Sequence, residues 1–267
     1  MTRRRIVVVA PLSGLGNRMR VVCGAWAWAE TARVPVQIAW QATRDCRARF
    51  EELFEPLPPP WATVSDGGAL YTPATKRNLL LPGLLRLSLG FRERRCFRPA
   101  DDGHFARLAA SARRLYVDSC HCLHPYPAGL MQRLFTPLPH LQQRILRFKG
   151  PSLGVHIRRT DNAQAILHSP TQAFRQAIDR YIEQGQAHTI YLATDDQQVK
   201  DLLRAAYGQR LVCQSAPAQR ATLHGMEDAV VDLWTLAHCT RILGSHYSSF
   251  SETAAEILGH PLHVIRQ

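Results

Sequence analysis

The chain has 267 residues, of which 46% are hydrophobic and 20% are charged, the composition of an ordinary globular protein. This length allows one large domain or two of about 130 residues each. The formal net charge of +12 comes almost entirely from arginine, because the lysines are Lys76, Lys149 and Lys200. Since no basic arm with interleaved aromatic residues is present, the charge predicts attraction to anionic substrates or membrane surfaces and argues against specific nucleic-acid binding.

No apolar run approaches the roughly 18 residues of a membrane-spanning helix. The apolar stretch 6–10 is too short for a signal peptide and leads into a polar turn, so we expect a cytoplasmic protein. Seven scattered cysteines fit a reducing compartment. The alternation in Cys120-His121-Cys122 predicts a strand with both thiols packed on one face, rather than a zinc site.

The first half begins as a Rossmann-like domain. Residues 5–12 form a near-continuous apolar strand, 17–33 an amphipathic helix and 35–40 a second strand. Residues 44–110 are irregular and predict short helices and long loops, and 115–122 predict another strand. Residues 142–149 close this domain, with Gly150-Pro151 as a linker, so we predict domains at 1–149 and 150–267.

The second half alternates strands and helices, which predicts a parallel sheet wound by helices. The expected strands are 153–157, 189–193, 210–214, 241–244 and 262–265, and the expected helices are 171–183, 197–207, 226–238 and 251–258.

Polar clusters follow three of these strands: Arg158-Arg159-Thr160-Asp161, Thr194-Asp195-Asp196, and the serine-rich turn 245–251. All three lie at carboxyl ends of strands, where open α/β sheets bind their ligands. The sequence therefore predicts a ligand site at this edge of the second domain.

The paired guanidiniums of Arg158 and Arg159 match phosphate oxygens in geometry and stay charged at any working pH. Adjacent residues of an extended chain point to opposite faces, so one arginine can bind substrate while the other pairs with Asp161. His156 lies within the strand, and both a packed core histidine and a ligand contact are open. Two solvated surface arginines are the alternative to the phosphate site.

The acidic residues of this half have more than one interpretation. Asp195 and Asp196 can cap the following helix, bind nucleotide hydroxyls or hold Mg²⁺, and we favour a cap for one and a nucleotide contact for the other. Asp232 lies at the border of a helix's buried stripe, where it either pairs with an arginine or accepts hydrogen bonds from a ligand.

Two turns before helices offer backbone N–H groups to an anion. In the turn 245–251, Ser248 and Ser249 can cap a helix and bind phosphate at the same time. In the first domain, Gly14 and Gly16 permit close approach of the backbone to a ligand, although a purely structural turn is the alternative.

Together these motifs resemble the GDP-fucose-dependent fucosyltransferase superfamily, which includes α1,6-fucosyltransferases, bacterial α1,2 enzymes and protein O-fucosyltransferases. The matching segments, in order, are G-L-G-N-R at 14–18, H-I-R-R-T-D at 156–161, Y-L-A-T-D-D at 191–196, and V-V-D-L with S-S-F-S between 230 and 251. The resemblance covers most of the chain. It implies a GT-B fold, in which two Rossmann-like domains face each other across a cleft, with the donor bound mainly by the second and the acceptor by the first.

The resemblance also implies roles for single residues. Arg158 and Arg159 would hold the pyrophosphate with help from Ser248 and Ser249, and Asp232 would contact guanine. His156 and Asp195 would contact the nucleotide. Asn17 would lie near the pyrophosphate and the transferred sugar, beside the substrate-binding turn of Gly14, Gly16 and Arg18.

One departure concerns the general base, because the α1,6 enzymes have a glutamate shortly after the arginine motif and 162–166 here contain no carboxylate. Asp161 is the nearest candidate, and Asp118, at the end of a strand in the first domain, is another.

We therefore predict an inverting, metal-independent enzyme that moves fucose from GDP-fucose to a hydroxyl of an oligosaccharide or glycolipid in bacterial glycan synthesis. It would need no cofactor and could be peripheral to a membrane. The alternatives are a noncatalytic nucleotide-sugar or glycan-binding protein and, ranked last, a nucleic-acid-binding protein.

Overall fold

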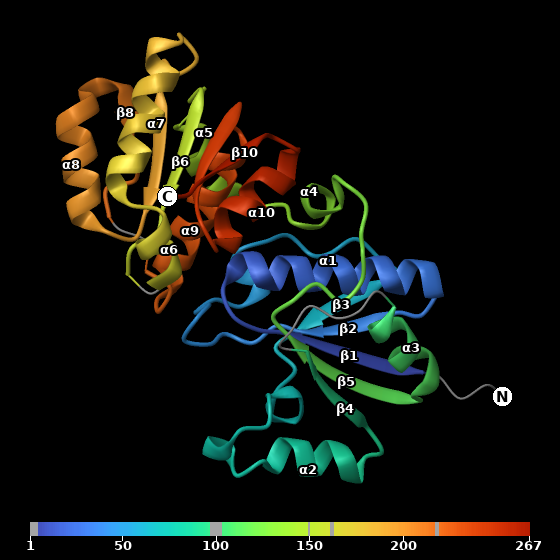
Figure 1. The fold of residues 1–267 in the computed structure, drawn as a ribbon. Coiled ribbons are helices and arrows are strands. Elements are labelled where there is room, and N and C mark those ends of the chain that lie inside the picture. Colours follow the sequence, from blue (N-terminus) through green and yellow to red (C-terminus); the bar gives the residue numbers. More distant parts are fainter. Residues whose placement is uncertain (1–4, 97–102, 149, 161–162, 217–218) are drawn as a thin grey trace. The chain divides into compact units, whose positions relative to one another are not determined.

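The structure is a computed structural model that describes residues 5–96, 103–148, 150–160, 163–216 and 219–267. Its chain divides into two compact units, Met1–Thr136 and Pro137–Gln267 (Figure 1). We expected the division at 149/150. It falls earlier because helix α5 (Pro139–Leu146), assigned from the sequence to the first domain, packs on helix α9 (Leu223–Ala237) of the second unit.

The first unit contains a five-stranded parallel sheet with the order β3-β2-β1-β5-β4. Its strands are β1 (Ile6–Pro11), β2 (Val36–Ala39), β3 (Ala62–Ser65), β4 (Arg92–Cys96) and β5 (Arg114–Ser119). The apolar strand β1 is central, with Val8 opposite Gln37 of β2 and Tyr116 of β5. This placement explains its uninterrupted hydrophobic run, because a central parallel strand is covered on both faces.

The region 44–110 is more regular than its sequence indicates. It contains β3, β4, helix α2 (Leu81–Ser88) and helix α3 (His104–Ser111). The remaining helical elements of this unit are α1 (Leu15–Ala32), α4 (Leu130–Leu134) and the 3₁₀ turns η1 (Phe50–Glu52), η2 (Ala69–Tyr71) and η3 (Lys76–Asn78). Strand β4 was missed because its sequence, R-E-R-R-C, has no apolar alternation.

The second unit has a parallel sheet with the order β10-β9-β6-β7-β8. Its strands are β6 (Leu153–Ile157), β7 (Ile190–Thr194), β8 (Leu211–Val212), β9 (Arg241–Ser245) and β10 (Leu262–Ile265). Its helical elements are α5, α6 (Ala163–His168), α7 (Thr171–Glu183), α8 (Gln197–Tyr207), η4 (Gly208–Arg210), α9 and α10 (Ser249–Leu258). The predicted alternation is confirmed, and α7 and α8 have the predicted bounds; α6 was not predicted.

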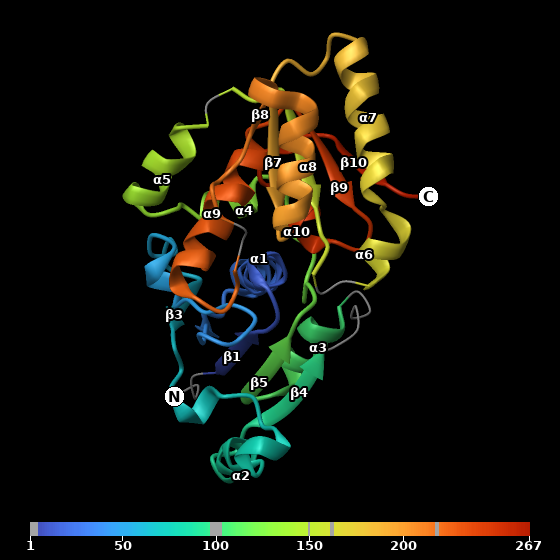
Figure 2. The same ribbon diagram turned by 90° about the vertical axis from the view of Figure 1, so that its left-hand side faces the viewer.

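The sheet of the second unit lies between two helical layers (Figure 2). Helices α7 and α8 share a buried apolar cluster with β6 and β7 that includes Phe174, Ile178 and Leu203. Helices α9 and α10 contact each other and cover the other face. Strand β6 lies between β7 and β9, so the chain order reverses beside it and a crevice is expected at the carboxyl ends of β6 and β9.

Within the ranges given above, no helix combines the length and the apolar character needed to cross a bilayer.

A close approach of backbone and helix at the end of β9 yields a stability prediction. A Cβ added to Gly244 would lie 2.7 Å from Ser251 Cβ and 2.9 Å from Leu262 Cδ1. We expect Gly244→Ala to lower the free energy of unfolding by about 1–3 kcal/mol, as overpacked cores do, in a urea denaturation experiment. When Ser251→Gly is added to Gly244→Ala, the double variant should lose less free energy of unfolding than the sum of the losses in the two single variants. A Gly244→Ala protein as stable as the parent would contradict this packing.

Candidate functional site

The three polar clusters of the second unit meet at the carboxyl ends of β6, β7 and β9. The backbone N–H of Arg158, directly after β6, donates to Ser245 Oγ at the end of β9 over 3.0 Å. The next N–H, of Arg159, donates to Asp195 Oδ1 after β7 over 2.7 Å. The predicted convergence of these clusters is therefore confirmed, and hydrogen bonds between neighbouring strands hold it.

Asp195 organises the loop that follows β6. Its Oδ2 accepts the hydroxyl of Thr160 over 2.7 Å, while its Oδ1 accepts the Arg159 N–H. Burial by itself would raise the pKa of this carboxyl group, but the hydrogen bonds and the positive charge of Arg158 outweigh burial and lower its pKa. Asp195 is therefore a charged anchor for the arginine loop, and the nucleotide contact that the resemblance implied for it stays a prediction.

The Arg158 side chain lies beside this anchor and does not extend into bulk solvent. Its Nε is 3.9 Å from Asp195 Oδ2, and 11% of the side chain is exposed. The planar fork of N–H donors of a guanidinium matches the oxygens of a phosphate group. This position suits a contact with a phosphate group.

The guanidinium of Arg159 points instead into the second unit. Its Nη2 donates to the backbone oxygen of Ser169 over 2.7 Å, and its Nε and Nη2 both donate to Thr171 Oγ1 at the start of α7. Burial lowers its pKa, although Asp195 and Asp196 oppose this effect. These bonds indicate that Arg159 positions the loop, and the pyrophosphate contact that the resemblance implied for it stays a prediction.

His156 is a buried neutral imidazole under the serine-rich turn. Burial, assisted by the charge of Arg158, lowers its pKa to about 3. Its Nδ1 lies 3.5 Å from Ser248 Oγ, and its ring is 4.9 Å from the ring of Phe250. His156 thus links β6 to α10, as a packed core histidine does.

Helix α10 begins at the same edge. Ser248 is its N-cap residue, but its side chain makes no capping hydrogen bond and its hydroxyl faces His156 instead. The backbone N–H groups of the first turn, which begins at Ser249, have no partner inside a helix and carry partial positive charge. This end of the helix therefore suits an anion.

Tyr247, which sequence reasoning did not select, precedes this helix. Its backbone is in the left-handed region, with φ of 52°, and 69% of the residue is exposed. Such a conformation is unfavourable for an aromatic residue and concentrates at ligand sites. A left-handed non-glycine position has no signature in the sequence, so only the structure identifies Tyr247.

Of the two adjacent aspartates after β7, Asp196 caps α8. Its Oδ1 accepts from the N–H groups of Gln198 and Val199, which confirms the cap expected for one of the pair. Among the residues that the structure describes, no three His, Cys, Asp or Glu side chains are grouped as metal ligands would be.

Cys120 and Cys122 do not lie in a strand, contrary to expectation, because β5 ends at Ser119. Among the residues that the structure describes, neither cysteine is part of a disulfide, and both are half-buried. The Ser119 hydroxyl donates to the backbone oxygen of His121 and accepts from the backbone N–H of the same residue. These local hydrogen bonds replace the ladder of a strand.

Asp232 lies inside the second unit, on the face of α9 that covers β7. Its Oδ1 accepts from the hydroxyl of Tyr191 over 2.6 Å and from the amide of Gln214 over 2.8 Å. Burial raises its pKa to about 6, although both hydrogen bonds and Lys200 lower it. This buried network indicates a structural role for Asp232, and it gives no support to the guanine contact that the resemblance implied.

In the first unit, the glycine turn leads from β1 into α1 as predicted. Ser13 has a left-handed φ of 70°, Gly14 is the N-cap residue, and Gly16 is buried in the first helical turn. The side-chain amide of Asn17 donates to Ser13 Oγ over 3.2 Å. The turn therefore presents Asn17 next to a backbone in an uncommon conformation, as ligand-facing turns often do.

Arg18 has a different role from the substrate contact that we predicted. It is fully buried, and its guanidinium donates to the oxygens of Ser13 and Gln41 and to Thr43 Oγ1. Burial lowers its pKa, while the charge of Asp45 opposes this effect. Arg18 joins the glycine turn to the chain beyond β2 and so positions the turn.

Asp118, the alternative base, lies at the carboxyl end of β5. It is buried, its Oδ2 is 3.6 Å from Arg95 Nε, and its Oδ1 has no hydrogen-bond partner in the described part of the chain. Burial raises its pKa to about 6, and Arg95 partly opposes the shift. A carboxyl group with this pKa takes up a proton near neutral pH, as a general base must. The other candidate base, Asp161, lies outside the described residues.

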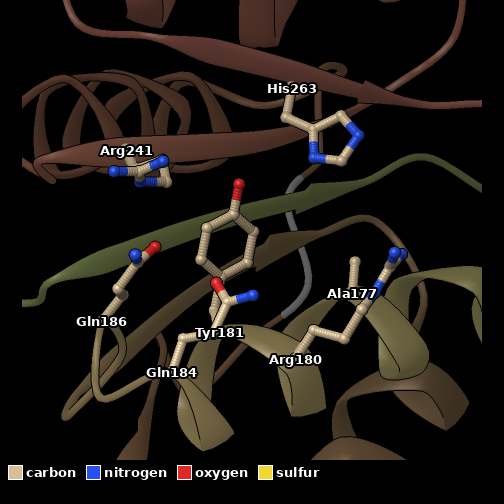
Figure 3. Close-up of a pocket in the computed structure, with 7 residues that line it drawn as sticks. All are labelled: Ala177, Arg180, Tyr181, Gln184, Gln186, Arg241 and His263. Carbon is tan, nitrogen blue, oxygen red and sulfur yellow. The ribbon is translucent and has the colours of Figure 1, made fainter.

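A pocket of about 310 Å³ lies elsewhere on the second unit (Figure 3). Arg241, at the start of β9, and His263 of β10 line it opposite Tyr181 of α7. The guanidinium of Arg241 is 5.2 Å from the Tyr181 ring. Because the pocket is at the amino end of β9, it is separate from the site around Arg158.

The role of Asp232 can be tested by two substitutions. Asp232→Ala leaves the Tyr191 hydroxyl and the Gln214 amide without their partner, so it should cost about 1–3 kcal/mol of unfolding free energy. Asp232→Asn keeps the size of the side chain and an oxygen acceptor, so we expect it to cost less than Asp232→Ala. Urea denaturation measures both effects. An Asp232→Ala protein as stable as the parent would contradict the structural role.

No family model matches the chain. Its fold is similar to that of NodZ, an α1,6-fucosyltransferase from Bradyrhizobium, in a crystal soaked with GDP-fucose: 18% identity, 96% of this chain, 93% of that chain and a TM-score of 0.63. A variant of Arabidopsis thaliana FUT1 in complex with GDP matches at 13% identity over 98% of this chain and 70% of that chain, with a TM-score of 0.64. POFUT1 in complex with GDP matches at 12% identity over 99% of both chains, with a TM-score of 0.59. The chain thus has the α/β fold of these fucosyltransferases, with two parallel five-stranded sheets, as the GT-B prediction required.

Proposed function

We propose that the protein is an inverting, metal-independent glycosyltransferase that moves fucose from GDP-fucose to a hydroxyl group of a glycan acceptor. The observation that carries this proposal is the position of Arg158, which Asp195 holds at the carboxyl edge of β6, the strand next to the β9–α10 turn. A fixed cation near a helix N-terminus is suited to a diphosphate. The fold neighbours that were crystallised with GDP or GDP-fucose support this choice of donor.

In the proposed reaction, the second unit binds the donor. The bond between the sugar C1 and the diphosphate oxygen breaks, and the bonding electrons leave with the diphosphate. Arg158 and the first N–H groups of α10, beside Ser248 and Ser249, stabilise the charge that develops there. Because these groups are fixed before the reaction, they supply the positive charge that a divalent ion supplies in other transferases.

The other predicted residues take supporting roles in this scheme. His156 orients Ser248, while Arg159 and Asp195 hold the loop that carries Arg158. Burial keeps His156 unprotonated near neutral pH, so it contributes hydrogen bonding and no positive charge at this edge.

The first unit is proposed to serve the acceptor. An acceptor hydroxyl attacks C1 from the face opposite the diphosphate, which inverts the configuration, and a carboxylate takes its proton. We assign this base to Asp118, whose raised pKa and unpartnered oxygen suit the task. Asn17 is proposed to contact the transferred sugar from the glycine turn.

Donor binding tests the role of Arg158. Loss of a charged hydrogen bond costs about 1.5–3 kcal/mol, so Arg158→Ala should weaken GDP binding by about ten- to a hundred-fold in titration calorimetry with EDTA present. The matched control is Arg180→Ala, since Arg180 is an exposed arginine that lines the pocket near the amino end of β9. Strict dependence of GDP binding on Mg²⁺, or equal affinity of Arg158→Ala and the parent, would contradict the proposal. A panel of sugar nucleotides, including GDP-mannose, would define the donor.

The pH dependence of turnover tests the base. Asp118 must be deprotonated to accept a proton, so kcat/KM should fall as pH decreases through about 6, the raised pKa of this group. Asp118→Asn should remove that acid limb and lower kcat by about 10²- to 10⁴-fold without loss of GDP affinity. Product NMR of the fucosylated acceptor would report inversion. Full activity of Asp118→Asn, with loss in Asp161→Asn, would transfer the role to Asp161. Tight GDP binding with no turnover on any glycan would indicate a nucleotide-sugar-binding protein.

A further inference from the structure

Helix α2 of the first unit has its apolar residues on the outside. Seven leucines between positions 79 and 89 are exposed, and Leu79, Leu81 and Leu87 are each at least 60% exposed. Single exposed leucines are common on soluble proteins, but a contiguous group of this size marks a site of interaction.

A buried arginine fixes the inner face of the same helix against the sheet. Arg86 is fully buried, and its guanidinium lies 3.8 Å from the centre of the Tyr116 ring. Its Nε donates to Glu93 Oε1 over 2.6 Å, and its Nη1 donates to the backbone oxygens of Leu70 and Thr72. These bonds determine which side of α2 faces the sheet, so the leucines lie on the outer side of the helix.

The backbone before α2 also directs the leucines outward. Leu79 and Leu80 both have left-handed φ values, 53° and 60°, which cost energy for residues with a Cβ. On the inner side, Gly83 lets the helix approach Ala74, because an added Cβ would be 3.1 Å from Ala74 Cβ. Both ribbon views show α2 beyond β4, the edge strand of the first sheet (Figures 1 and 2).

The charges near the leucines identify the partner. Lys76 and Arg77, in η3 just before the helix, are exposed, as are Arg92 and Arg94 of β4. Glu93 is the only acidic residue between 72 and 96, and Arg86 pairs with it. A surface of leucines and cations favours an apolar partner that carries negative charge. A second copy of the chain would bring the same positive charges together, which disfavours self-association through this face.

We propose that η3 and α2 form a docking surface for an anionic lipid bilayer. The leucines would enter the boundary between headgroups and acyl chains, while Lys76 and Arg77 contact lipid phosphates. An apolar face and a basic cluster are the two signals that together give stable binding of a peripheral protein to a membrane. This inference does not depend on the proposed donor chemistry, because Arg158 and its partners lie in the other unit.

Vesicle co-sedimentation tests this inference. We expect the protein to bind phosphatidylcholine vesicles that contain phosphatidylglycerol, and to bind pure phosphatidylcholine vesicles at least about ten-fold more weakly. Leu84→Gln/Leu85→Gln should weaken binding to the anionic vesicles by more than about ten-fold, because two apolar anchors are lost. Lys76→Gln/Arg77→Gln should weaken it by about ten- to thirty-fold and reduce its salt dependence.

Leu202→Gln is the matched control, because Leu202 is a 45% exposed leucine on α8 of the other unit. We expect the Leu202→Gln protein to bind anionic vesicles as well as the parent does. Unchanged thermal unfolding would show that each variant is folded. No binding of the parent to anionic vesicles would overturn the inference. So would equal binding of the Leu84→Gln/Leu85→Gln variant and the parent. A dimer in analytical ultracentrifugation that the leucine substitutions abolish, without vesicle binding, would assign the face to a second copy.

Discussion

The arrangement of the loops at the carboxyl ends of β6, β7 and β9 depends on one carboxylate. Asp195 lies where burial opposes its charge, yet it remains ionised because the Thr160 hydroxyl, two backbone N–H groups and Arg158 surround it. The same bonds fix the course of the chain after β6. The direction of Arg158 therefore follows from the hydrogen bonds of its neighbours, and a cation in a fixed position can stabilise a leaving group without reorganising.

Arginine has two distinct uses in this protein. Arg18, Arg86 and Arg159 are each bonded to backbone carbonyl oxygens, and they join loops within their own unit. The planar guanidinium suits this work, because it offers five donors in fixed directions and remains charged. The high arginine content is thus partly a property of the interior, and net charge by itself overstates the positive charge available to a ligand.

Arg158 and Arg159 are adjacent in the sequence but have different roles. The sequence predicts that they diverge, but it does not predict which of them turns inward. Strand geometry predicts that Arg158 and Arg159 diverge, and they do. Which of the two turns inward depends on Ser169 and Thr171, whose positions at the start of α7 come from the packing of that helix on the sheet. For Asp232, the sequence indicates a position at the border of the buried stripe of α9. It does not indicate the partners of the carboxylate, Tyr191 and Gln214, because they lie outside this helix.

The sequence by itself determined the alternation of apolar strands with amphipathic helices, and hence the parallel sheet of the second unit and the edge at which its polar loops meet, because these follow from local periodicity and from chain direction. The tertiary structure alone decided which carboxylates are buried with raised pKa values, where the first unit ends and why α2 turns its leucines outward. Those properties depend on groups that are distant in sequence: Asp118 beside Arg95, α5 on α9, and Arg86 under Tyr116. No local pattern contains both members of such a pair, so only the folded chain brings them together.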